Sequence, residues 1–186
     1  GKTIQSQDVF EAVGKHQRGE MNDNELYQIE SRACPGPGSC GGMFTANTMS
    51  SVGEALGLSL PGSASEPAVD QRKSASSRLA GEAVLNLLRN DIKPSDILTK
   101  EAFENAVTVV TAMGGSTNTC LHLPAIAYEA GIDLTLEDIH DISMRTPHLA
   151  NMKPAGKYLM YDLDNVGGVP LVMKRLLDLG LIHGEC

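Results

Sequence analysis

Two cysteines stand in a segment built almost entirely of glycine and proline. Cys34 and Cys40 enclose the residues Pro-Gly-Pro-Gly-Ser, and Gly41 and Gly42 follow directly. Flanking glycines let a backbone approach a bulky group closely. The helix expected just after Gly42 would offer its positive end to Cys40, which lowers the pKa of a thiol. A thiolate presented in this way suits a metal cluster or a nucleophile, whereas a buried structural cysteine needs no such setting.

Of the two cysteines, Cys40 is the stronger candidate, because it has both the adjoining glycines and the helix start. Cys34 competes with it, and its alternative interpretation is a packing thiol before Pro35. Five residues between cysteines is not a zinc-knuckle spacing, and no second pair of Cys or His stands at a suitable distance. A thiol-based redox or zinc module therefore remains only an alternative. Cys120, expected inside a helix, is predicted to be a core thiol.

A second segment whose side chains could bind a ligand is Gly-Gly-Ser-Thr-Asn at positions 114–118. Gly114 is expected to end one helix and Ser116 to start the next. The N-terminus of a helix with nearby hydroxyls also suits a carboxylate. Ser116 and Thr117 are therefore candidate substrate-binding residues, and the alternative is a capping role alone.

The elements that must position these segments are mostly helices, because apolar residues recur at spacings near 3.6. Leu79, Ala83 and Leu87, with their neighbours Val84 and Leu88, predict a buried side for the longest helix. Lys157 to Tyr161 is the best candidate for a strand. The sequence thus predicts a mainly α segment, which we expect to be the helical part of an α/β domain. Helices are expected over 6–19, from 22 onward, and over 44–57, 68–90, 99–113, 116–131, 135–146 and 170–180.

Capping signals mark the starts of three of these helices. Asn22 followed by Glu25 resembles a capping box, Thr99 is expected to cap the helix that follows it, and Thr135 is followed by Asp138 three residues on. The expected inner face of the helix after Thr99 consists of Phe103, Val107, Val110 and Met113.

Composition excludes several classes of protein. The chain is 41% hydrophobic and 20% charged, which argues against wholesale disorder. Its net charge of −8 and its scattered Lys and Arg disfavour a nucleic-acid binder. No stretch approaches the roughly 20 apolar residues that span a bilayer. The chain begins with Gly1 rather than Met and shows no signal peptide, so we expect both ends to be cuts through a longer chain.

The order of motifs resembles the dihydroxyacid dehydratases over nearly the whole chain. The related sugar-acid dehydratases, of the 6-phosphogluconate type, share Gly-Gly-Ser-Thr-Asn but differ after the cysteine, where this chain has Gly-Gly-Met-Phe. The resemblance therefore favours the branched-chain amino acid enzyme over its sugar-acid relatives. The similar segments are 33–49, 54–61, 112–118, 121–123 and 167–170.

The resemblance implies a hydro-lyase that converts 2,3-dihydroxy acids, such as 2,3-dihydroxyisovalerate and 2,3-dihydroxy-3-methylvalerate, to 2-oxo acids in valine and isoleucine biosynthesis. It implies Mg²⁺ and an iron–sulfur cluster, [2Fe–2S] or [4Fe–4S], held by three cysteines of which Cys40 matches the third. It also implies a homodimer in the cytoplasm, or in an organelle of a eukaryote, with no membrane or nucleic-acid partner.

The same resemblance makes residues 1–186 a partial N-terminal, cluster-binding domain of an α/β/α type. The other two cluster cysteines and most Mg²⁺ ligands, including a carbamylated lysine, would precede this segment. The serine base and a glutamate ligand of Mg²⁺ would follow it. We therefore expect no catalytic residue within the chain and a catalytically silent fragment. A purely structural helical domain is the remaining alternative.

Overall fold

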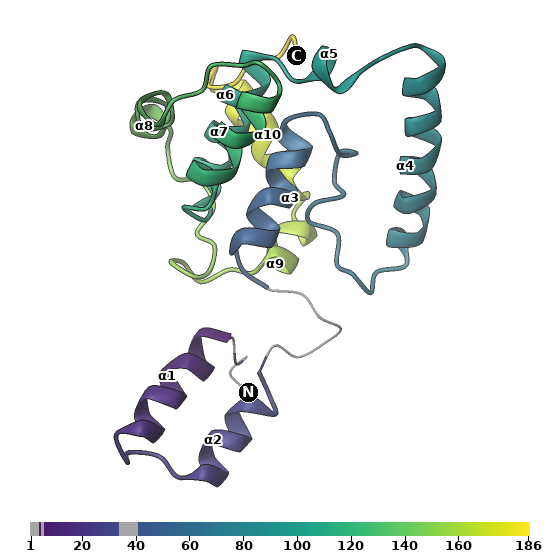
Figure 1. The fold of residues 1–186 in the computed structure, drawn as a ribbon. Helices are drawn as coiled ribbons and strands as arrows, with labels where there is room; N and C mark the ends of the chain where they lie inside the picture. Colours follow the sequence, from purple (N-terminus) through teal and green to yellow (C-terminus); the bar gives the residue numbers. More distant parts are fainter. Residues whose placement is uncertain (1–3, 5, 34–40) are drawn as a thin grey trace. The chain divides into compact units, whose positions relative to one another are not determined.

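The structure is a computed structural model that describes residue 4 and residues 6–33 and 41–186. Cys34 and Cys40 lie outside the described residues. The chain divides into two compact units, Gly1–Gly41 and Gly42–Cys186, and each is described by itself. The described parts contain ten helices (Figure 1): α1 (Ser6–Gln17), α2 (Asp23–Glu30), α3 (Thr45–Ala55), α4 (Arg72–Arg89), α5 (Pro94–Ile97), α6 (Lys100–Met113), α7 (Thr119–Glu129), α8 (Leu136–Arg145), α9 (Met160–Asn165) and α10 (Gly168–Asp178).

The first unit is a pair of helices, α1 and α2, that lie side by side (Figure 1). Asn22 forms the capping box expected at the start of α2. Its side-chain oxygen accepts from Glu25 N at 3.0 Å, and the Glu25 carboxylate accepts from Asn22 N at 2.9 Å. These bonds satisfy two N–H groups that a helix start otherwise leaves without partners. The local signal at Asn22 is confirmed.

The second unit is organised around α6, most of whose residues are buried. Helices α3, α7, α8 and α10 all pack against it. The Thr99 hydroxyl caps its start by accepting from Ala102 N at 3.2 Å, and Gly114 ends it in the left-handed conformation with φ of 66°. The predicted inner face of this helix is confirmed, since its apolar members are all buried: Phe103, Val107, Val110 and Met113.

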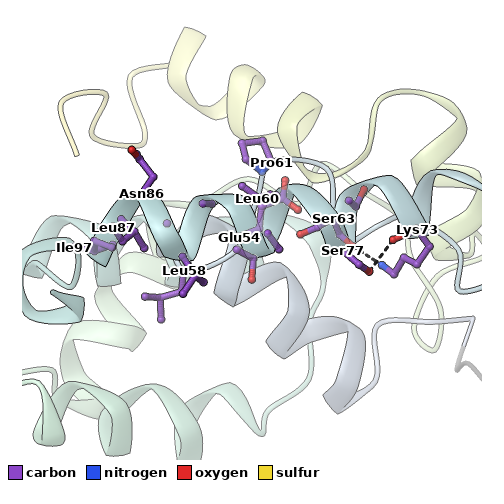
Figure 2. A pocket seen from close by; sticks show the side chains of 16 residues that line it. Glu54, Leu58, Leu60, Pro61, Ser63, Lys73, Ser77, Asn86, Leu87 and Ile97 are labelled. Carbon is purple, nitrogen blue, oxygen red and sulfur yellow. Dashed lines mark hydrogen bonds between the residues drawn. The ribbon is translucent and has the colours of Figure 1, made fainter. Parts of the chain in front are cut away.

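Helix α4 is the exception to this packing (Figure 1). None of its residues is buried, and Leu79, Val84 and Leu88 are 47%, 63% and 76% exposed. The prediction of a buried side for this helix is therefore wrong. Apolar spacing identifies a face that is able to pack, but it does not supply the partner, and a groove separates α4 from the loop that follows α3 (Figure 2).

A mainly α fold is confirmed in the described part of the chain, whereas the surrounding α/β/α arrangement stays a prediction. The strand expected at 157–161 is wrong: Tyr158 forms only a single bridge with Met152, and α9 begins at Met160. The helix after Gly115 starts at Thr119 rather than at Ser116, because residues 116–118 form a tight turn first. Within the described ranges, no helix combines the length and the apolar character needed to cross a membrane.

Candidate functional site

Two segments that carry the sequence motifs meet in space. The hydroxyl oxygen of Thr48, in α3, accepts a hydrogen bond from the backbone N–H of Ser116 at 3.0 Å. The side-chain amide of Asn118 donates to Thr45 Oγ1, in the first turn of α3, at 2.6 Å. The start of α3 and the loop before α7 therefore form one local structure. We call Thr45, Ser116, Thr117 and Asn118 the hydroxyl cluster.

Two glycines allow this approach. Gly114 has a positive φ, which costs little only for glycine. A Cβ at Gly115 would overlap Val110 Cγ1 and lie 3.1 Å from Thr48 Cγ2. Thr48 is fully buried, and its hydroxyl is satisfied on both sides because it also donates to Met43 O at 3.3 Å. The glycines of the motif are thus required by packing around Thr48.

A third segment fixes the chain just before α3. Met43 N donates to the carbonyl oxygen of Lys153 at 2.6 Å, and Asn47 Nδ2 donates to Gly42 O at 2.6 Å. A Cβ at Gly42 would lie 2.8 Å from the same Lys153 oxygen. Gly42 is therefore a glycine because another backbone occupies the space where a side chain would begin.

His148 links this third segment to the hydroxyl cluster's loop. Its Nε2 donates to Ala150 O at 2.7 Å, and the ring lies against Gly114, so that a Cβ there would be 3.1 Å from Nε2. The N–H groups of Leu149 and Ala150 both donate to Ala112 O, at 2.8 and 3.0 Å. The chain from His148 to Lys153 thus ties the end of α6 to the residues that precede α3.

The two predicted substrate-binding residues differ in how far they are already engaged. Ser116 is half-buried, and its Oγ accepts from both the backbone N and the Nδ2 of Asn118, at 3.3 and 3.2 Å. Thr117 is exposed. Among the described residues, only its carbonyl oxygen is engaged, by Cys120 N at 3.0 Å. Its hydroxyl and its N–H therefore remain available to a ligand.

Ser116 and Thr117 line an open hollow of about 580 Å³. One wall comes from the loop before α7 and the other from α8, which contributes His140 and Ser143. Val107 and Val110 of α6 and Ile139 of α8 supply apolar lining. A hollow with apolar walls and a few polar groups is typical of a small-molecule site.

The structure describes only two of the four cysteines, Cys120 and Cys186. Cys40, the predicted cluster ligand, and Cys34 lie outside the described residues. Cys120 is exposed, so the prediction of a core thiol is wrong. Its position in the first turn of α7 faces outward, whereas Leu123 and Ala127 take the buried side of that helix. The described ranges hold no group of three or more His, Cys, Asp or Glu side chains placed to bind a metal ion.

Glu54 is a structural residue that the sequence analysis missed. Its buried carboxylate accepts from Gly62 N at 2.6 Å and from Ala64 N at 3.1 Å, and so anchors the loop after α3. Burial raises the pKa of Glu54 above its ordinary value of 4.5, and the two N–H donors oppose that rise. An acidic residue beside Val52, Ala55 and Leu56 was the available signal, because a charge on a buried helix face needs partners.

That loop and α4 enclose a second hollow, of about 630 Å³ (Figure 2). Lys73 crosses one end, where its Nζ donates to Ser63 O at 3.1 Å. Leu58, Leu87 and Ile97 make the other end apolar. None of the hydroxyl cluster lines this groove, so it is a separate feature of the unit.

Comparison with known proteins places the chain in a class of dehydratases. All of residues 1–186 match the family described as dihydroxy-acid/6-phosphogluconate dehydratase N-terminal, and the chain belongs to that family. Dihydroxy-acid dehydratase 2 of Staphylococcus saprophyticus is 59% identical over 186 residues, which are 100% of this chain and 33% of that protein. Dihydroxy-acid dehydratase of Sulfurisphaera tokodaii is 57% identical over 185 residues, which are 100% of this chain and 33% of that protein.

A third relative, dihydroxy-acid dehydratase of Mycobacterium leprae, is 58% identical over 179 residues, which are 96% of this chain and 32% of that protein. The chain thus spans about a third of the length of these curated relatives. The resemblance seen in the sequence motifs is confirmed. The names of these relatives favour the dihydroxy-acid branch of the family over the sugar-acid branch.

Proposed function

We propose that this chain is part of a hydro-lyase that removes water from 2,3-dihydroxy acids to give 2-oxo acids. The proposed substrates are 2,3-dihydroxyisovalerate and 2,3-dihydroxy-3-methylvalerate, the precursors in valine and isoleucine biosynthesis. The observation that carries the proposal is identity of 54–59% along the chain to proteins named dihydroxy-acid dehydratase. A sugar-acid substrate is the less favoured alternative, because no such name appears among those relatives.

Within this enzyme, we propose Cys40 as one ligand of an iron–sulfur cluster of the [2Fe–2S] or [4Fe–4S] type. The donors that meet in the described residues are hydroxyls, an amide and backbone N–H groups, which suit an oxygen-rich substrate rather than iron. The segment that follows Cys40 fits a ligand role in another way. Gly42 and Met43 are fixed on the carbonyl of Lys153, which gives a firm anchor two residues beyond the cysteine.

The bound cluster and Mg²⁺ would supply Lewis-acid assistance to the departing C3 hydroxyl and charge neutralisation at the substrate carboxylate. The chain's own contribution is binding. Thr117 lines the hollow with a hydroxyl and an N–H that have no partner among the residues the structure describes, and Ser116 lines it beside Thr117. We propose that these two residues hold oxygen atoms of the substrate. The remaining ligands and the base that removes the C2 proton are proposed to come from outside this chain.

We also propose an oligomeric state, a location and a class of partner for the enzyme. A homodimer that works on a small acid in the cytoplasm, or in an organelle of a eukaryote, is what the family resemblance implies. The acidic balance of the chain, with a net charge of −8, agrees with a partner that is not a nucleic acid.

A substrate comparison on the full-length enzyme tests the proposal. The enzyme, purified without oxygen and supplied with Mg²⁺, is given 2,3-dihydroxyisovalerate or 6-phosphogluconate at equal concentration, and 2-oxo acid formation is followed. We expect turnover of the dihydroxyisovalerate and little of the phosphorylated sugar acid. Faster turnover of 6-phosphogluconate would assign the enzyme to the other branch. No turnover of either compound, by protein whose cluster spectrum is intact, would reject the proposed function.

A further inference from the structure

We propose that Asn118 is a positioning residue, which turns the hydroxyls of Thr45 and Ser116 into hydrogen-bond donors aimed at one carboxylate. The nature of that carboxylate, a dihydroxy acid, rests on the proposed function. The direction of the hydrogen bonds does not, because it follows from the contacts of Asn118 alone. Thr45 thereby becomes a second substrate-binding hydroxyl, contributed by a different helix from the loop of Ser116 and Thr117.

The chemistry of an amide and of a hydroxyl fixes the direction of these hydrogen bonds. A side-chain amide nitrogen carries two N–H donors, whereas a hydroxyl carries one proton and two lone pairs. Asn118 Nδ2 lies 2.6 Å from Thr45 Oγ1 and 3.2 Å from Ser116 Oγ. Since the nitrogen only donates, both hydroxyl oxygens accept. Each hydroxyl is therefore left with its own proton to give to another group.

Ser116 is constrained further. The backbone N–H of Asn118 donates to the same Ser116 oxygen at 3.3 Å, so two donors occupy its two lone pairs. The Ser116 hydroxyl can then make one more hydrogen bond, in which its proton is donated. Within the described residues neither the Ser116 proton nor the Thr45 proton has an acceptor. At Ser116 a cation would need the two lone pairs that Asn118 already occupies, whereas an oxygen anion needs only the remaining proton.

The surroundings favour the same ligand. Ser116 and Thr117 line the 580 Å³ hollow, so a small molecule in it has access to both. Thr45 is not part of that lining, but it is only half-buried and lies within hydrogen-bonding distance of Asn118. Thr45 is the first residue of α3 and Asn118 directly precedes α7, and neither helix has an acidic residue in its first turn. A negative charge there would meet favourable helix dipoles and no carboxylate on either helix start. Two hydroxyl donors bound to one nitrogen match the two oxygens of one carboxylate.

The test uses the full-length enzyme with its cluster and the substitution Asn118→Asp. Aspartate has the same shape, but its oxygens only accept, so the two hydroxyls would turn inward and donate to it. It also adds a negative charge. We expect the KM for the dihydroxy acid and the Kd for its 2-oxo acid product, measured by calorimetry, to rise at least roughly tenfold. Iron content and the visible spectrum should stay those of the wild type.

Two further variants keep the test decisive if Asn118→Asp does not fold. Thr45→Val removes one donor at nearly constant volume and should raise the same Kd roughly tenfold, whereas Thr45→Ser keeps the donor and should leave the Kd within about twofold. Asn86→Asp is the matched control, because it adds the same charge on an exposed position of α4. It should change neither the KM for the dihydroxy acid nor the Kd for the 2-oxo acid product.

The outcomes separate the inference from the proposed function. If Asn118→Asp and Thr45→Val bind the product as tightly as the wild type, the positioning role is wrong even though the enzyme is a dehydratase. If the wild type does not turn over dihydroxy acids, the proposed function fails. The Kd of the wild type and of Asn118→Asp for 2-oxoisovalerate then still reports whether Asn118 prepares a carboxylate site. Equal loss of affinity in Thr45→Val and Thr45→Ser would also overturn the inference.

Discussion

The side-chain amide of Asn118 donates to the hydroxyl of Thr45 across 2.6 Å, although the two residues are 73 positions apart in the chain. This bond joins the segment after the predicted cluster cysteine to the loop of the predicted substrate-binding residues. Ser116 N and the Thr48 hydroxyl make a parallel connection at 3.0 Å. The two motifs therefore act as one structural feature, and its parts can be tested one at a time.

The buried hydroxyl of Thr48 is the first of these parts. Thr48→Val would leave Ser116 N–H and Met43 O without their present partner, so we expect a loss of about 1–3 kcal/mol in the free energy of unfolding. Urea titration followed by circular dichroism measures it. Thr108→Val is the control, because that hydroxyl donates only to Glu104 O within the same helix and should cost less than about 1 kcal/mol. Equal effects at the two positions would contradict the role given to Thr48.

The glycine at position 115 is the second part. Gly115→Ala would place a Cβ against Val110 and Thr48, so we expect it to destabilise the protein by about 1–3 kcal/mol. Gly81→Ala is the matched substitution, since that helical glycine in α4 has open space around its Cβ position. It should stabilise by about 0.5–1 kcal/mol. Thermal unfolding of both variants gives the comparison, and a stable Gly115→Ala protein would show that the close approach is not required.

Glu54 makes a prediction about pH. Its pKa is raised in the folded state, chiefly by burial, so the folded protein binds a proton more readily than the unfolded chain. The stability that this provides is fully present below the ordinary pKa of 4.5 and is lost as the pH rises through the raised value. The unfolding free energy of the wild type relative to Glu54→Gln should therefore fall as the pH rises from about 4.5 through that raised value. A constant difference across this range would refute the assignment.

At neutral pH, Glu54→Gln has a second effect. Its amide nitrogen would face the N–H of Gly62 or of Ala64, so one of the two hydrogen bonds would be lost. We expect a cost of about 1–3 kcal/mol, reduced by the relief of burying a charge. Glu82→Gln is the control, because Glu82 is exposed on α4 and, within the described part of the chain, pairs only with Arg78. Its effect should stay within about 0.5 kcal/mol.

Residues 1–186 alone should hold no stable cluster and show no dehydratase activity. Three cysteines are proposed to share the cluster, and only Cys40 is assigned to this chain, so most of the chelation is missing. Anaerobic incubation with iron and sulfide, followed by the visible spectrum and an assay with 2,3-dihydroxyisovalerate, measures both properties. A stable brown cluster with turnover would mean that the other cysteines and the base are dispensable.

Local signals in the sequence predicted most of the helices. The caps at Asn22, Thr99 and Thr135 are present, because each depends on side chains within a few residues. Gly114 and Gly180 end their helices with positive φ, as expected. Such features need no knowledge of the rest of the chain, so they are readable without a structure.

Two errors are local, namely the strand expected at 157–161 and the helix start expected at Ser116. The other errors concern contacts between distant residues. The apolar face of α4 has a helical period but no partner in the described structure, and Cys120 lies on the outer side of α7. The hydroxyls of Ser116 and Thr117 stand together in one sequence motif, but their contact with Thr45 and Thr48 was not predictable, and their role in substrate binding stays a prediction. That contact depends on how α6, which ends at Gly114, packs against α3. Helix packing of this kind cannot be read from the spacing of residues in the sequence.

Cys40→Ser in the full-length enzyme tests whether Cys40 is a cluster ligand, with Cys186→Ser, at an exposed cysteine, as the matched control. Iron per protein, the visible spectrum, the circular dichroism and the turnover of 2,3-dihydroxyisovalerate are measured for both. Because an alcohol is a poor ligand for an iron–sulfur cluster, Cys40→Ser should lose most of its iron and its turnover while keeping its helical signal. Cys186→Ser should keep the iron content, the visible spectrum, the circular dichroism and the turnover of the wild type. Full iron content and full turnover in Cys40→Ser would show that Cys40 does not hold the cluster.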